Sequence, residues 1–218
     1  MIDTPEHSID YMQNTGDFYR MRKAIMTLHK QAKVLTDAQA RTALRHLEGS
    51  RYPERYRVMF LLSVKAGLRA IEIAALQWAM VTDSDGHIAD AIALCNVASK
   101  GKNGGRVIPL NRDLRAALEA LHRIRRPGPY VARSERGLRM SAGSVTCWFQ
   151  RLYGDLGFVG CSSHSGRRTF VTKAAHKVVE AGGSLRDVQQ LAGHASLATT
   201  QRYIEGNSDA KRKLVNLI

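Results

Sequence analysis

The stretch from His164 to Tyr203 constrains this chain more than any other part of its sequence. It opens with His164-Ser-Gly-Arg167 at the start of a predicted helix, continues with Gly193-His194 after a short amphipathic segment, and ends at Tyr203. A helix turns about every 3.6 residues, so His164 and Arg167 project from one face. A guanidinium grips a phosphate with two hydrogen bonds, and an imidazole exchanges protons near neutral pH. With a second histidine and a phenol, this combination indicates attack by a tyrosine on a phosphodiester.

The charge of the chain points to a polyanionic partner. Its 218 residues include 33 Lys and Arg against 19 Asp and Glu, a formal net charge of +14. Such a surplus on a folded chain favours nucleic acid first and an anionic membrane second. No apolar run approaches the roughly 20 residues of a membrane span, so we expect no membrane partner. A basic protein of the ribosomal or chromatin kind is the plainer alternative.

Cysteine usage and the N-terminus indicate a cytoplasmic protein. The three cysteines, Cys95, Cys147 and Cys161, are odd in number, widely spaced and without a CxxC pair. This pattern is typical of reduced thiols rather than disulfides or a zinc site. The first residues lack a basic start followed by an apolar core, so we expect no secretory signal.

One acidic loop, Asp83-Ser-Asp85-Gly-His87, invites comparison with a calcium site. A calcium loop needs glycine at its sixth position and glutamate at its twelfth, and the twelfth residue here is Leu94. We therefore expect no metal in this loop or elsewhere in the chain.

Apolar residues at helical spacing dominate the chain, with one interruption. A turn at 85–86 precedes a strand-like run over 88–97, and a turn at 103–105 leads into a second run over 107–110. The predicted fold class is α+β, mainly α-helical, with one small antiparallel sheet. Residues 1–30 lack a clear period and form an expected N-terminal arm, partly helical or disordered. The expected catalytic domain covers 31–218, with a last helix over 207–218. The other helices are expected to begin at Thr36, Pro53, Asn111, Ser141 or Ser144, His164, Ser184 and Ser196.

Two local signals fix helix ends near the start of the domain. Thr36 with Gln39 predicts a capping box, and Gly67 predicts a helix end in the left-handed conformation. Arg69 follows this break at once, and Glu72, three residues later, is placed to hold its guanidinium. The commoner role of an arginine at such a junction is to cap helix carbonyls, and the sequence leaves both roles open.

Basic residues concentrate between Lys100 and Arg139. This segment holds eleven basic and three acidic residues, a net charge of +8, which is over half of the chain's excess. A run of charge usually marks a solvated face. Because so much of the excess gathers here, we expect part of the segment to contact a DNA backbone.

Together these residues resemble the tyrosine recombinase (phage integrase) family, from about Leu35 to Ile204. The resemblance rests on five pieces in the right order: Ala66-Gly67-Leu68-Arg69 with Glu72, Ser99-Lys100-Gly101 ahead of Arg106-Val-Ile-Pro109-Leu110, and the three C-terminal pieces described above. One piece alone would be weak, whereas five at plausible spacings are specific. The resemblance implies the catalytic-domain fold of that family.

The resemblance also implies a role for each position. Arg69 and Arg167 would clamp the non-bridging oxygens of the scissile phosphate, with Glu72 in support. His164 and His194 would hydrogen-bond the same phosphate, and His164 would accept the proton of Tyr203. Tyr203 would be the nucleophile that forms a 3′-phosphotyrosyl bond.

Further basic residues would complete the site. Lys100 would protonate the departing 5′ oxygen, although Lys102 competes for this role and spacing does not decide between them. The residues expected to contact DNA are Lys102, Arg106 and Arg168. Two arginines, two histidines and a lysine make a cofactor or divalent metal unnecessary, so we expect none.

The activity implied is site-specific recombination, in which DNA strands are cut and rejoined. The implied partner is double-stranded DNA at a specific site, on the nucleoid of a bacterium or on phage DNA. The chain would form a tetramer on DNA and be a monomer or weak oligomer without it. Two alternatives remain: a catalytically idle DNA-binding regulator of the same fold, and a relaxing enzyme similar to type IB topoisomerases.

Two departures from the family pattern carry expectations of their own. Gly166 stands where the family usually has leucine, which predicts loose packing at the entrance of its helix. Typical members carry a helical DNA-clamping domain of roughly 100 residues before the catalytic one. Because only the short arm precedes the resemblance here, the chain resembles the short members that lack this domain, or a part of a longer chain.

Overall fold

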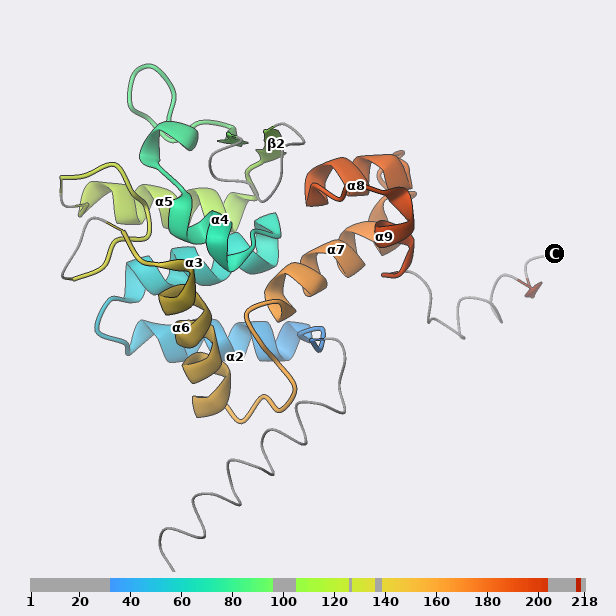
Figure 1. Cartoon of the computed structure of the whole chain (residues 1–218), viewed down its shortest axis with the longest axis horizontal. Helices are drawn as coiled ribbons and strands as arrows, with labels where there is room; N and C mark the ends of the chain where they lie inside the picture. Colours follow the sequence, from blue (N-terminus) through green and yellow to red (C-terminus); the bar gives the residue numbers. More distant parts are fainter. Residues whose placement is uncertain (1–31, 96–104, 126, 136–138, 204–214, 217–218) are drawn as a thin grey trace, which may run out of the picture. The chain divides into compact units, whose positions relative to one another are not determined.

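A computed structural model describes residues 32–95, 105–125, 127–135, 139–203 and 215–216. The predicted arm over 1–30, Lys100, Lys102 and most of the predicted helix over 207–218 lie outside these ranges. The elements, drawn in Figure 1, are α2 (Asp37–Glu48), α3 (Pro53–Ala66), α4 (Ala70–Ala75), a 3₁₀ helix η1 (Trp78–Met80), β1 (Ala91–Leu94), β2 (Arg106–Pro109), α5 (Arg112–Arg123), α6 (Ala142–Asp155), α7 (Ser165–Lys177), α8 (Leu185–Ala192) and α9 (Leu197–Gln201).

Helix α3 is the centre of the packing. Its residues from Val58 to Val64 are all buried, and it packs against α2, α5 and α7. A helix that is apolar all round has no solvated face and must lie inside the domain. None of the described helices is long and apolar enough to cross a membrane.

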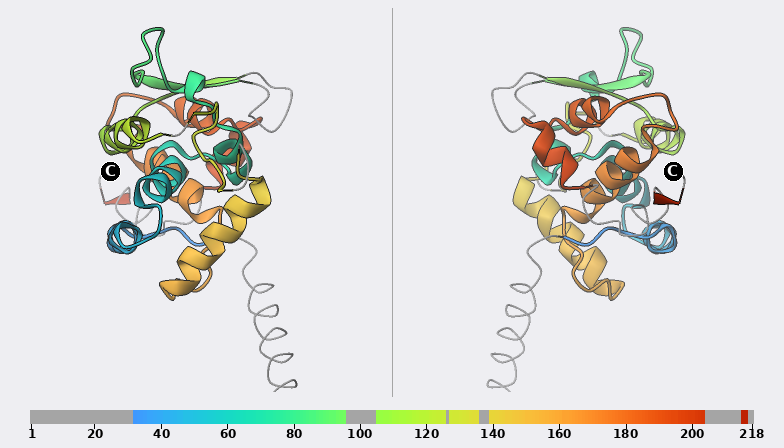
Figure 2. Two further views of the ribbon diagram at one scale, coloured as in Figure 1. Left: turned by 90° about the vertical axis from the view of Figure 1, so that its left-hand side faces the viewer. Right: turned by 90° about the vertical axis from the view of Figure 1, so that its right-hand side faces the viewer.

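The two strands form an antiparallel pair in which Ala91 faces Pro109 and Leu94 faces Arg106. This confirms the predicted small sheet, although β1 begins at Ala91 rather than at Ile88. The strand starts later because the preceding residues pair back across the turn: Ile88 bridges to Thr82, and the Ala89 N–H donates to the Val81 carbonyl at 2.9 Å. Strand β2 also contacts α8, and the sheet lies beside this helix in Figure 2.

The predicted helix ends are confirmed. The Thr36 hydroxyl accepts from the Gln39 N–H at 3.1 Å, and the Gln39 side chain accepts from the Thr36 N–H at 3.0 Å. Gly67 ends α3 with a φ of 66°. A Cβ at Gly67 would overlap the Phe170 ring on α7, so glycine is needed there for its conformation and for the close approach of α7.

The predicted loose packing at Gly166 is wrong. Gly166 is buried in the first turn of α7, and a Cβ there would overlap the Ser63 hydroxyl and lie 2.8 Å from Ser63 Cβ and 3.0 Å from Val64 Cγ1. The missing side chain therefore lets α3 and α7 approach each other closely. Because the two helices are so close, Arg167, the next residue, lies beside the C-terminal end of α3.

Gly166→Ala is expected to lower the free energy of unfolding by about 1–3 kcal/mol, because the added methyl group overpacks the α3–α7 contact. Gly154→Ala in α6 is the matched control, since nothing lies within 4 Å of its added Cβ. That change should stabilise the protein by about 0.5–1 kcal/mol, the usual gain for alanine over glycine inside a helix. Urea unfolding of both variants measures whether each change raises or lowers the free energy of unfolding. Equal stabilisation by both changes would contradict the close α3–α7 approach.

Candidate active site

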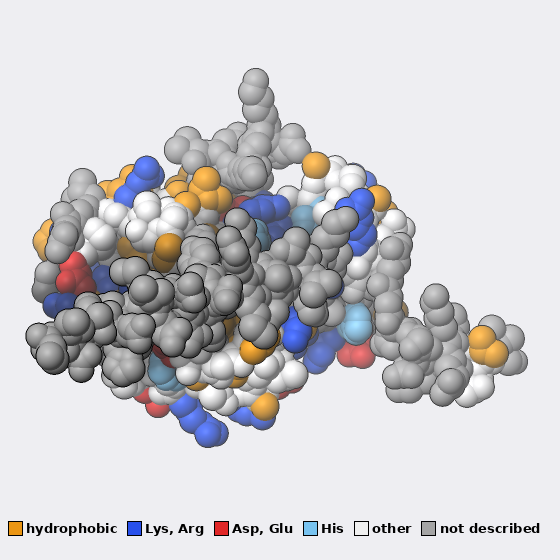
Figure 3. Space-filling view, turned by 60° about the horizontal axis from the view of Figure 1, so that its bottom comes forward, with side chains coloured by type: hydrophobic (Ala, Val, Ile, Leu, Met, Phe, Trp, Pro, Cys, Tyr) orange, Lys and Arg blue, Asp and Glu red, His pale blue; other side chains and the backbone are white. Residues whose placement is uncertain are grey.

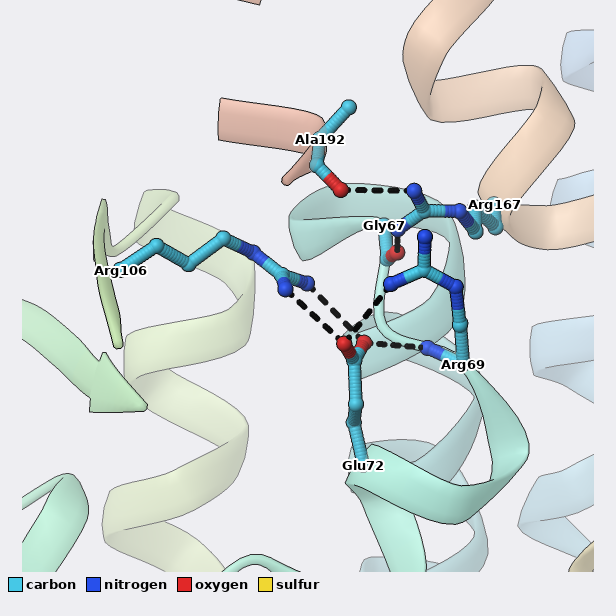
Figure 4. Close-up of polar contacts among 6 residues, drawn as sticks. All are labelled: Gly67, Arg69, Glu72, Arg106, Arg167 and Ala192. Carbon is cyan, nitrogen blue, oxygen red and sulfur yellow. Dashed lines mark hydrogen bonds and ion pairs between the residues drawn. The ribbon is translucent and has the colours of Figure 1, made fainter. Parts of the chain in front are cut away.

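Glu72 is the buried centre of the site. It lies in α4, its side chain is 0% exposed, and its two oxygens accept hydrogen bonds from two arginines, as Figure 4 shows. Arg69, the residue before α4, donates its backbone N–H to Oε2 at 2.8 Å and its Nη1 to Oε1 at 2.9 Å. Glu72 thus holds the Arg69 side chain, as the sequence predicted. The two residues are only three positions apart.

Arg106 is the second arginine on Glu72. From the first position of β2 it donates Nη1 to Oε1 at 2.8 Å and Nη2 to Oε2 at 2.9 Å. Burial raises the pKa of Glu72, but the hydrogen bonds and charge of Arg106, with those of Arg69, outweigh it and hold the pKa below its ordinary value. The carboxylate is therefore ionised at neutral pH. The sequence predicted a DNA contact for Arg106 and missed this ion pair.

Arg167 joins three segments of the chain. Its side chain, only 4% exposed, donates Nη1 to the Gly67 carbonyl at 2.7 Å and Nη2 to the Ala192 carbonyl at 2.6 Å. It therefore fixes α7 against the ends of α3 and α8. Burial, followed by the nearby charge of Arg69, lowers the pKa of Arg167 to about 10. The guanidinium still carries its proton at neutral pH.

His194 follows directly on the left-handed end of α8 at Gly193. Its Nδ1 lies 3.0 Å from the hydroxyl of Thr200, which is fully buried in α9. Burial lowers the pKa of His194 to about 4, helped by the charges of Arg167, Arg69 and Arg106. The imidazole is therefore neutral at pH 7. Thr200 fixes the ring orientation, and no local pattern in the sequence marks it for this task.

The pKa of His194 predicts a pH dependence of stability. Between its ordinary value of 6.5 and about 4, the unfolded chain binds this proton and the folded chain does not. The contribution of His194 to the free energy of unfolding is therefore fully present above pH 6.5, and it is lost as the pH falls from 6.5 toward 4. Melting temperatures at several pH values should fall less steeply over this window for His194→Gln than for the unchanged protein. Parallel curves would contradict the assignment.

Tyr203 lies beside His194 and Arg167. Its ring stacks on the His194 ring, with centroids 5.6 Å apart and planes at 19°. It packs on a small apolar cluster of Val171, Ala175, Val188 and Ala192. The Arg167 guanidinium lies within electrostatic range of the Tyr203 side chain. The structure therefore brings Tyr203, His194 and Arg167 together, as the sequence pattern predicted.

Two further predicted residues, His164 and Arg168, lie at the start of α7 on either side of Arg167. His164 is exposed at the N-terminal end of α7, and its N–H donates to the Ser162 hydroxyl at 3.3 Å. Its role as proton acceptor stays a prediction. Arg168 is partly buried on the same helix, and its contact with DNA also stays a prediction. Figure 3 shows other Lys and Arg side chains at the surface.

A group of possible metal ligands occurs in the turn before β1. Asp83, Asp85 and His87 are exposed and bring one ligand atom each within 4.8 Å of one another. The Asp83 carboxylate accepts from the N–H groups of Asp85 at 3.0 Å and His87 at 2.8 Å, so it already stabilises the turn. The group lies outside the cluster around Glu72, and the expectation of no metal stays a prediction.

Comparison with known proteins identifies the family of this chain. The model of the phage integrase family matches residues 33–209, well over half of the sequence. The chain belongs to the phage integrase family. Tyrosine recombinase XerC of Shewanella amazonensis is 32% identical over 154 residues, which cover 68% of this chain and 48% of that protein. XerC of Rhizobium meliloti is 34% identical over 112 residues, 47% of this chain and 33% of the relative. The chain thus spans half or less of these relatives.

Solved structures share the fold of the family. The integrase of transposon Tn1549, in complex with circular-intermediate DNA, superposes with a TM-score of 0.67 at 21% identity and covers 87% of this chain and 67% of its own. The XerA recombinase gives a TM-score of 0.65 at 22% identity, with 87% and 66% covered. The predicted phage integrase catalytic-domain fold is therefore confirmed.

Proposed function

We propose that this chain cuts and rejoins DNA strands at a specific site through a 3′-phosphotyrosyl bond to Tyr203. The observation that supports this most is the meeting of Tyr203, His194 and Arg167 from three segments of α7 to α9, next to Arg69. Membership of the phage integrase family and the DNA in the Tn1549 integrase complex support the same chemistry.

The charges around the site suit a scissile phosphate. Two arginines bind the Glu72 carboxylate and a third, Arg167, lies within electrostatic range of it, which leaves an excess of positive charge where the phosphoryl oxygens would gain negative charge. Preorganised donors at such a position lower the activation barrier by roughly 3 kcal/mol each. Arg69 and Arg167 would bind the non-bridging oxygens, and His194, with Nδ1 held by Thr200, would donate through Nε2.

In the proposed step, one bond to phosphorus forms as another breaks, and each proton that moves has a donor and an acceptor. The Tyr203 oxygen attacks phosphorus, its proton passes to His164, and the bond from phosphorus to the 5′ oxygen breaks. That oxygen takes a proton from Lys100 or Lys102. A phenolic oxygen is a weak nucleophile while it keeps its proton, so the proposed attack needs a base to accept that proton, and His164 is proposed for this. The reverse attack by a 5′ hydroxyl rejoins the strands without ATP, metal or cofactor.

The same proposal covers assembly and domain organisation. We take 31–218 as the catalytic domain, with an arm over 1–30 and a helix over 207–218 that docks on a neighbouring copy in a tetramer on DNA. Without DNA, the chain would be a monomer or weak oligomer. The reaction would take place in the cytoplasm, where bacterial and phage DNA lies.

Suicide DNA tests this function. A pool of nicked duplexes, which lose a short strand on cleavage, traps the covalent intermediate, and a denaturing gel separates it from free protein. We expect an adduct that persists in detergent, and sequencing of its DNA end would identify the site. A protein that binds the pool but forms no adduct would be a DNA-binding regulator. Relaxation of plasmids without a preferred sequence would indicate the topoisomerase-like enzyme instead.

A further inference from the structure

The arginine at the start of β2 is bound in a way that the catalytic scheme does not use. Arg106 is 34 residues from Glu72, yet its two terminal nitrogens meet the two oxygens of that carboxylate at 2.8 and 2.9 Å. Its side chain is 10% exposed and that of Glu72 is 0% exposed. A planar, two-bond contact of this kind fixes both orientation and distance, which a lysine cannot do.

The neighbours of Arg106 hold it in this position. Gly193, with a φ of 61°, passes so close that a Cβ there would lie 2.8 Å from Arg106 Nη1 and 3.1 Å from Cδ. Glycine is therefore needed at this position for its backbone conformation and for the space that the arginine fills. The guanidinium lies between the Glu72 carboxylate and the segment that carries His194.

Glu72 shares its charge between two guanidinium groups because Arg106 is present. Oε1 accepts from Nη1 of Arg69 and Nη1 of Arg106, and Oε2 accepts from the Arg69 N–H and Nη2 of Arg106. The four acceptor positions of the carboxylate are filled. Among the described residues, the Arg69 side chain donates to Glu72 through Nη1 alone, which leaves its other N–H groups for a phosphate.

We propose that Arg106 is a positioning residue of the phosphate site, which neutralises Glu72 so that Arg69 keeps its charge and its remaining donors for DNA. The inference rests on the proposed function. Without Arg106, Glu72 would pair one to one with Arg69, turn both oxygens toward it and cancel its charge. The pair would then attract a phosphate less, although Arg69 and Glu72 are both intact.

Arg106→Met tests the proposal, because methionine keeps much of the length without charge or donors. Cleavage of a suicide duplex in a single turnover should be at least about 10-fold slower, while the Kd for the same DNA stays within about threefold. Arg115→Gln is the matched control: Arg115 also anchors the sheet region, through the Ile88 carbonyl and Asp90, away from Glu72. Its cleavage rate should not change.

The decisive variant is the double change Arg106→Met with Glu72→Gln. If Arg106 acts by neutralising Glu72, removal of the carboxylate charge frees Arg69 again, and cleavage should recover at least threefold over Arg106→Met alone. A purely structural ion pair predicts no recovery, because a second buried contact is lost. Arg106→Lys keeps the charge and loses the paired geometry. It should cleave at an intermediate rate, and it serves with the same readouts if Arg106→Met unfolds.

The outcomes separate this inference from the proposed function. Cleavage by Arg106→Met at the unchanged rate, or an equal or deeper loss in the double variant, would overturn the positioning role while the adduct of the unchanged protein still supports recombination. If the unchanged protein forms no adduct with any duplex, the proposed function fails and this inference fails with it.

Discussion

Tyr203→Phe should abolish the covalent protein–DNA adduct and leave DNA binding nearly unchanged. The substitution removes one oxygen, and phenylalanine still fills the position on the Val171 and Val188 cluster and can stack on His194. Since the missing oxygen is the proposed nucleophile, no adduct should form above background. The measurement is adduct yield on denaturing gels beside the Kd for the same duplex.

Tyr153→Phe is the matched control for this change. The Tyr153 hydroxyl is buried in the main core and has no hydrogen-bond partner among the residues that the structure describes. Its removal should leave adduct formation unchanged and should not lower the melting temperature, since a buried hydroxyl without a partner is destabilising. An adduct from Tyr203→Phe at the normal yield would show that another residue attacks the phosphate.

Arg167→Ala should reduce cleavage at least about 100-fold and retain DNA binding. The guanidinium is proposed to stabilise charge that develops on the phosphoryl oxygens during attack, and a donor of this kind typically contributes 100-fold or more. Most of the binding energy comes from basic residues along the DNA backbone, so the Kd should change only a few-fold. Single-turnover rates and binding curves on one duplex separate the two effects.

Arg167→Lys is a second variant, which distinguishes a loss of cleavage from a loss of folding. Alanine at 167 leaves the carbonyls of Gly67 and Ala192 without their donor, which costs roughly 1–3 kcal/mol for each buried group. Lysine keeps the charge but carries its three N–H donors on a single nitrogen. It should fold better than alanine and still cleave well below the unchanged rate, because one nitrogen cannot replace the two that reach the Gly67 and Ala192 carbonyls and also bind a phosphate. Equal loss of cleavage and binding in both variants would count against a role in the transition state.

Local patterns in the sequence predicted the parts of the fold that depend on near neighbours. The capping box at Thr36, the left-handed end at Gly67 and the pairing of Arg69 with Glu72 each involve residues at most five apart, where spacing alone determines which groups meet. The order of five such pieces then indicated the family, which supplied the global arrangement that spacing does not contain.

Contacts between distant segments were not predictable in the same way. Arg106 reaches Glu72 across 34 residues, and Arg167 reaches the Gly67 carbonyl across 100. Gly166 suggested loose packing because its partner, Ser63, lies on another helix, and only the packed structure shows that a side chain would collide there. Lys100 and Lys102 lie outside the described residues, so the role of proton donor proposed for one of them stays a prediction.

The site of the covalent bond tests the central claim most directly. Digestion of the trapped adduct with trypsin and a nuclease leaves a peptide that carries a short phosphodeoxynucleotide, and fragmentation in a mass spectrometer locates the modified residue. The peptide that contains Tyr203, which trypsin releases by cutting after Arg202, should carry the nucleotide through its phenolic oxygen and the 3′ phosphate. A nucleotide attached to any other residue, or through a 5′ phosphate, would contradict the account.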